Sequence, residues 1–142
     1  MGLVEKRIIA EFQEKHQKEV LAKIQAVLPY PVEFTIAWDG ITNQMIQYGC
    51  TLEGLVGYFE SIFVIPIVNV FSEICSNETR LASLRNKMKT IHLCSTDDWK
   101  CGVDSFTLKD SIFTVDHSMV NIDKFGENDR TEILTQYMKK NL

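Results

Sequence analysis

The sequence lacks a long hydrophobic run. Its most apolar window, residues 62–71, contains Pro66 and Asn69 and lies between Glu60 and Glu73. A membrane-spanning helix needs about 20 predominantly apolar residues. We therefore expect this window to belong to the core of a protein that does not span a membrane. The start of the chain carries charged residues where an export signal needs an apolar stretch, so no such signal is predicted.

Sequence motifs for common catalytic chemistry are also missing. The chain contains no phosphate-binding glycine loop, nucleophile elbow or paired-carboxylate motif. Cysteines are few, four in all, and three of them lie in or beside apolar segments where a thiol packs as a small hydrophobic group. Without an export signal they are expected to remain thiols in a reducing compartment, which predicts a cytoplasmic location.

An excess of positive charge is absent as well. Fifteen Lys and Arg residues stand against 19 Asp and Glu residues, for a formal net charge of −4. Nucleic-acid phosphates require clustered cations, so no nucleic-acid partner is expected. Residues 91–129 hold eight acidic and three basic side chains, whereas residues 78–90 hold four basic and one acidic. This asymmetry favours a basic protein partner or self-association, with ordinary solubility as the alternative explanation.

Helical periodicity is present in four parts of the chain. These are residues 4–28, 52–76, 77–88 and a closing segment from Asp129. Pro66 predicts a kink in the second segment, which is therefore either one kinked helix or two helices. Asn77 is a suitable N-cap for the third. The segment 38–50 shows no clear period and is expected to be a loop.

Strand-like alternation occurs in the segments VEFTIAW, KTIHLCS and SFTLKDSIFTV. A tight turn at Asp110-Ser111 in the last segment places its four large apolar side chains on one face: Phe106, Leu108, Phe113 and Val115. The same parity predicts that Leu93 lies opposite Phe106 and Ile91 opposite Leu108.

These patterns predict one globular α+β domain over residues 1–142. The expected architecture is a two-layer sandwich, in which a largely antiparallel sheet of about four strands has helices packed on one face. The other face of the sheet is predicted to be polar and open.

The stretch IHLCSTDDWKC, residues 91–101, gathers a histidine, two cysteines and two aspartates. Zinc sites need four convergent ligands, usually with pairs spaced C-x₂₋₄-C or H-x₃₋₅-H. The spacing of Cys94 and Cys101 is wider than this, and His92 and Cys94 share a strand face without a third strong ligand. No metal site and no cofactor are therefore predicted.

Three sets of side chains are candidate functional groups. The predicted register places Asp104 opposite His117, and this pair is the candidate for catalysis. The partner-binding candidates lie in the expected 96–103 loop and on the open face: Asp97, Asp98 and Asp116. The ligand-binding candidates belong to the 38–50 loop: Trp38, Asp39 and Tyr48.

The absence of catalytic motifs and the acidic strand region favour a small non-enzymatic protein-interaction module, such as an inhibitor or immunity-type partner of a basic protein. The alternative is a small-molecule-binding protein or enzyme, with a pocket between sheet and helices near Asp104, His117 and the 38–50 loop. A deep polar pocket favours the alternative. A filled core beneath a flat polar sheet face favours the interaction module.

Overall fold

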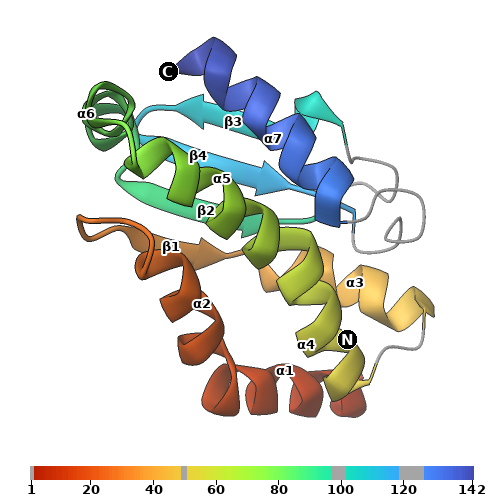
Figure 1. Cartoon of the computed structure of the whole chain (residues 1–142). Helices are drawn as coiled ribbons and strands as arrows, with labels where there is room; N and C mark the ends of the chain where they lie inside the picture. Colours follow the sequence, from red (N-terminus) through yellow and green to blue (C-terminus); the bar gives the residue numbers. More distant parts are fainter. Residues whose placement is uncertain (1, 49–50, 97–101, 119–126) are drawn as a thin grey trace.

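The apolar spacings of the sequence produce the helices and strands drawn in Figure 1, a computed structural model that describes residues 2–48, 51–96, 102–118 and 127–142. The elements follow in the order α1 (Leu3–Lys15), α2 (Gln17–Gln25), β1 (Glu33–Ile36), α3 (Trp38–Tyr48), α4 (Leu52–Phe59), η1 (Glu60–Val64), α5 (Ile65–Cys75), α6 (Glu78–Lys87), β2 (Thr90–Cys94), η2 (Val103–Ser105), β3 (Phe106–Lys109), β4 (Ile112–Asp116) and α7 (Glu127–Asn141). η1 is a π-helical segment and η2 is a short 3₁₀ helix.

The four strands form one mixed sheet in the order β1-β2-β4-β3. β1, β2 and β4 run parallel, and β3 is antiparallel to β4. The α+β class is confirmed, but the expectation of a largely antiparallel sheet is wrong. β2 does not pair with β3 as predicted. It pairs with β4, where Ile91 is opposite Phe113 and Leu93 is opposite Val115.

The difference has a topological origin. β3 lies at the edge of the sheet, and β4 returns from the tight turn into the position between β3 and β2. The hairpin itself is confirmed in its predicted register. Asp110 and Ser111 have φ values of 55° and 67°, as a type I′ turn requires. Alternation determines the face that a side chain occupies but not the neighbouring strand, so either pairing keeps Ile91 and Leu93 in the core.

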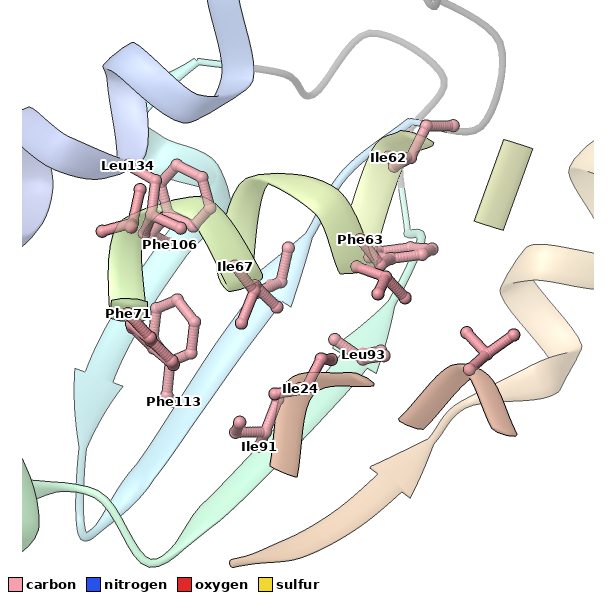
Figure 2. Packing of buried hydrophobic residues seen from close by; sticks show 14 of the residues in the cluster. Ile24, Ile62, Phe63, Ile67, Phe71, Ile91, Leu93, Phe106, Phe113 and Leu134 are labelled. Carbon is pink, nitrogen blue, oxygen red and sulfur yellow. The ribbon is translucent and has the colours of Figure 1, made fainter. Parts of the chain in front are cut away.

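In the part of the chain that the structure describes, helices cover one face of the sheet and leave the other face open (Figure 1). Every strand residue on the covered face is buried or half-buried, whereas exposed strand residues such as Glu33, Thr107 and Ile112 belong to the other face. The core lies between the sheet and the helices, as Figure 2 shows. Burial stabilises each large aliphatic or aromatic side chain there by about 1.5–3 kcal/mol, so packing on the covered face holds the strands in place.

Two helical predictions need correction. The segment 38–50, expected to be a loop, contains α3 from Trp38 to Tyr48. The N-terminal helix is divided at His16, whose φ of −126° departs from helical geometry. The capped helix α6 is confirmed, because the Asn77 side chain accepts a hydrogen bond from the Arg80 backbone N–H at 2.9 Å.

The segment from Leu52 to Cys75 is one continuous helix. Pro66 lacks a backbone N–H and its ring crowds the preceding turn, and the π-helical segment η1 widens that turn, with the N–H of Ile65 donating to Glu60 O. By length and composition alone this helix of 24 residues could cross a membrane. Half of its most apolar stretch is buried inside the molecule, which also fits the core helix of a globular protein.

Candidate functional site

Polar residues gather where the parallel strands end. Because β1, β2 and β4 point the same way, the residues that follow them meet at one edge of the sheet. In open sheets of parallel strands, ligands bind outside this edge. We use the name carboxyl-edge cluster for residues 38–40, 95–96 and 116–118 together with Arg130.

α3 approaches the end of β2 closely at Gly40. A Cβ atom at this position would lie 2.1 Å from the carbonyl oxygen of Ser95, well inside the ~3.5–4.0 Å of van der Waals contact. Only glycine fits this approach. The same turn is tied by Thr42, whose hydroxyl donates to Trp38 O at 2.6 Å. The start of α3 is therefore held against the backbone that follows β2.

Asp116 joins the end of β4 to the segment after β2. It is 7% exposed, and its carboxylate accepts hydrogen bonds from Thr96 N at 2.8 Å and Thr96 Oγ1 at 2.5 Å. The sequence parity placed Asp116 on the open face as a partner-binding charge. In the structure this carboxylate is buried and bonded within the molecule, so it is not a surface charge.

His117 and Arg130 meet in the interior. Both are fully buried, and Arg130 Nη1 lies 2.6 Å from His117 Nδ1. A guanidinium only donates, so Nδ1 accepts and the neutral ring carries its proton on Nε2. Burial and the charge of Arg130 lower the pKa of His117 to about 3, opposed by Asp116. His117 is therefore neutral near pH 7.

The same arginine connects α7 to the end of β4. Arg130 Nη2 lies 3.5 Å from Ser118 O, and the His117 ring packs on Phe106 with centroids 4.8 Å apart. The sequence patterns above do not single out Arg130. A signal was available, because spacing to Leu134 and Met138 places Arg130 on the buried stripe of α7, where a cation is unusual.

This arrangement limits the chemistry of the cluster. Nδ1 of His117 faces a permanent cation, so it is poorly suited to accept a proton from a substrate. Four buried side-chain polar atoms lack a hydrogen-bond partner within the described part of the chain, and three of them lie at or near this edge: Ser95 Oγ, Ser105 Oγ and His117 Nε2.

The predicted catalytic pair does not meet across the hairpin. The β3–β4 ladder ends where Phe106 pairs with Val115. Asp104 lies beyond it in η2 and is exposed, whereas His117 is buried against Arg130. A catalytic role for Asp104 and His117 stays a prediction.

The predicted ligand-binding residues belong to α3. The half-buried Trp38 ring packs at the margin of the core, 5.4 Å from the Phe12 ring and 5.9 Å from the Phe59 ring. Asp39 is exposed. The side chain of Tyr48 and the partner-binding candidates Asp97 and Asp98 lie outside the described residues.

The open face of the sheet consists mostly of short polar side chains. One row crosses all four strands at the same register level: Thr35, His92, Thr114 and Thr107. A second row beside it contains Glu33, Thr90, Ile112 and Lys109. Thr35 Oγ1 and His92 Nδ1 are 2.6 Å apart, and Ile112 is 40% exposed. This face is wide, mainly polar and interrupted by one exposed aliphatic side chain.

Two further properties bear on function. Among the residues that the structure describes, no three His, Cys, Asp or Glu side chains are grouped so that they could hold a metal ion. Cys94 is buried. A hollow of about 260 Å³ lies between α5, α6 and the end of α7 and is lined by residues outside the carboxyl-edge cluster.

Comparison of the chain with protein-family models, with curated proteins and with solved structures finds no match. We therefore infer function from the contacts, charges and surfaces alone.

Proposed function

We propose that this chain is a non-enzymatic protein-interaction module that docks a basic protein on the open face of its sheet. One observation carries the proposal: three of the four strands are parallel, yet helices cover only one face. All-parallel sheets are almost always covered on both faces, and the β1-β2-β4 part of this mixed sheet is parallel. A partner that packs on the open face would complete this arrangement.

The side chains of the open face suit a protein contact. Threonines flank His92 and occupy three of the four strands in the central row, and short side chains lose little rotamer freedom on docking. Ile112 adds exposed apolar area on β4, one of the two inner strands. Non-obligate interfaces are about as apolar as the rest of a protein surface, so a mainly polar face with one exposed aliphatic side chain is compatible with such a contact.

The charge of the molecule favours a basic partner. The net charge is −4, and Asp39, Asp104 and Asp110 are exposed. The sequence-predicted candidates Asp97 and Asp98, which lie outside the described residues, contribute to the same net charge. Such charges would steer a basic protein toward the sheet, at a rate that falls as salt rises.

The interior contacts of the carboxyl-edge cluster support a non-enzymatic role. Asp116 is bonded to Thr96, and Nδ1 of His117 is bonded to Arg130. Both groups hold strand ends and α7 together. A side chain that is already bonded within the protein in this way is less available to exchange a proton with a substrate. Cys75 is a free thiol, which fits the cytoplasmic, reducing location that we include in the proposal.

The proposal is tested by comparing baits that differ at one side chain. Thr114→Arg places a long cation in the central row of the open face, whereas Thr79→Arg makes the same change in charge on the exposed surface of α6. Urea unfolding would first confirm that both variants fold. The proteins that each bait captures from a cell lysate at low and at high salt would then be quantified by mass spectrometry.

A basic protein retained by the wild type and by Thr79→Arg, lost with Thr114→Arg and weakened by salt, is the expected result. Equal retention by all three baits would contradict docking on the open face. If the wild type forms a salt-resistant dimer in sedimentation and Thr114→Arg dissociates that dimer, the partner is a second copy of this chain and not a basic protein.

A second candidate function, binding of a small molecule with or without catalysis, is favoured by the unpartnered polar atoms of Ser95, Ser105 and His117. The N-terminal end of α3, with Trp38 and Asp39, borders the same edge. A ligand at this site would raise the melting temperature of the wild type, and Ser95→Ala would reduce that increase. Capture of a partner on the open face should be unaffected by Ser95→Ala.

A further inference from the structure

The helical layer contains a hollow that neither the open face nor the carboxyl-edge cluster uses. It lies between α5, α6 and the end of α7, with a volume of about 260 Å³. It is slightly smaller than the ~300–1,000 Å³ of most ligand pockets, which restricts it to a small ligand.

The floor of the hollow is apolar. Val70 and Ile74 line it from successive turns of α5, and Met138 lines it from α7. Their exposed fractions are 2%, 5% and 2%, so the floor belongs to the core. Methionine is flexible and polarisable and adapts to apolar ligands of different shape. The floor would therefore accept an aliphatic or aromatic group.

The walls of the hollow are held together by hydrogen bonds. Ser83 Oγ of α6 donates to Leu142 O at 3.1 Å, and Lys87 Nζ donates to Asn141 O at 2.8 Å. These contacts tie α6 to the end of α7 on the same side of the helical layer (Figure 1). A ligand would enter a preformed space and would not have to separate the helices.

The rim carries three charges that are not used within the protein. Glu73 of α5, Arg80 of α6 and Lys139 of α7 line the hollow and are exposed. The ion pairs found in the described part of the chain join Lys15 to Glu11 and Lys23 to Glu60, and none involves these three side chains. The charged side chains that line the hollow are thus two cations and one carboxylate.

The rim also determines which groups can donate to a ligand. The hydroxyl of Thr135, another lining residue, donates to Thr131 O at 2.8 Å, so its hydrogen is engaged. The hydrogen-bond donors that remain free are those of Arg80 and Lys139. Both are suited to a carboxylate, which Arg can bind through two parallel hydrogen bonds.

We propose that this hollow binds a small carboxylate with an apolar body. The apolar part lies on Val70, Ile74 and Met138, and the carboxylate is held by Arg80 and Lys139. Simple carboxylic acids and free apolar α-amino acids both have this chemistry. Glu73 distinguishes them, because its carboxylate repels a simple acid and attracts the ammonium group of an amino acid.

Three probes with the same aromatic body separate these possibilities: 3-phenylpropanoate, phenylalanine and 2-phenylethylamine. Binding would be followed by the ¹³C-methyl NMR signal of Met138, assigned with Met138→Leu. We expect saturable shifts with at least one of the two carboxylate probes, at dissociation constants of about 1–10 mM, as is usual for ligands of this size. The amine should cause no saturable shift.

Variants of the rim test the charge argument. Arg80→Gln and Lys139→Gln should each weaken the binding of the carboxylate probe by about threefold. Lys140→Gln is the matched control, since Lys140 is exposed on α7 and does not line the hollow. Glu73→Gln should strengthen the binding of 3-phenylpropanoate and weaken the binding of phenylalanine. The probe that binds more tightly to the wild type identifies the ligand class.

Several results would overturn the proposal. They are no saturable shift with either carboxylate, a shift as large with the amine, or equal losses of affinity for Lys140→Gln and Arg80→Gln. A Met138 signal that moves with protein concentration in the absence of probe would instead assign the hollow to contact with a second copy of this chain.

Discussion

The close approach of α3 to the end of β2 can be tested with a pair of identical substitutions. Gly40→Ala puts a methyl group 2.1 Å from the carbonyl oxygen of Ser95, and that oxygen is backbone and has little room to move. Gly57→Ala in α4 makes the same change at an exposed helical position where a Cβ atom meets nothing within 4 Å.

The two substitutions should have opposite effects on the free energy of unfolding. Alanine stabilises an exposed helix position by about 0.5–1 kcal/mol relative to glycine, so Gly57→Ala should raise stability by that amount. At Gly40 the same gain is opposed by overpacking of about 1–3 kcal/mol or more, and we expect a net loss of about 1–2 kcal/mol.

Urea unfolding followed by circular dichroism measures both free energies, and unchanged m-values would show that the unfolding transition is comparable. In thermal unfolding, each kcal/mol corresponds to roughly 2–4 °C for a chain of this size. If Gly40→Ala stabilised the protein as Gly57→Ala does, the placement of α3 against Ser95, and with it the geometry of the carboxyl-edge cluster, would be wrong.

Three further predictions concern the turn, the buried histidine and metal. Ser111→Gly should stabilise the fold by about 0.5–1 kcal/mol in urea unfolding, because Ser111 has a φ of 67° and is exposed; a loss would count against the type I′ turn. The pKa of His117 is lowered to about 3, so between about pH 6.5 and pH 3 the unfolded chain binds a proton that the folded chain does not. The free energy of unfolding should therefore decrease as the pH is lowered through that window, by up to about 1.4 kcal/mol per pH unit. His117→Asn should remove this part of the pH dependence. Superimposable pH dependences for the two proteins would count against a buried neutral histidine. Elemental analysis should find well under one equivalent of zinc, iron or copper, and a chelator should leave the melting temperature unchanged; stoichiometric metal lost on replacing Cys94 would overturn this expectation.

Local patterns predicted the hairpin and the apolar faces of the strands, but not the order of the strands. The turn at Asp110-Ser111 has its own chemistry, and its register follows directly. The neighbour of β2 depends on long-range packing, which the alternation of a single strand does not encode. Ile91 and Leu93 face the core whether β2 pairs with β3 or with β4, so their alternation does not indicate which strand is the neighbour of β2.

The helix α3 was not visible in the sequence because its buried positions carry polar side chains. Thr42 and Gln44 are 1% and 5% exposed, beside the fully buried Ile41, so the apolar stripe that indicates an amphipathic helix is incomplete. The carboxyl-edge cluster was missed for a similar reason. Arg130 and His117 are 13 residues apart, and no local pattern indicates that α7 packs against the end of β4.

The central claim, that a partner covers the open face of the sheet, is tested most directly by methyl NMR of the chain bound to the partner recovered with the wild-type bait. The account predicts that the methyl signals of Ile112, Thr114 and Thr107 shift on binding, while those of Leu3 and Val4 on the exposed surface of α1 stay unchanged. Shifts confined to α1 and the helical layer, with Ile112 and Thr114 unaffected, would contradict it.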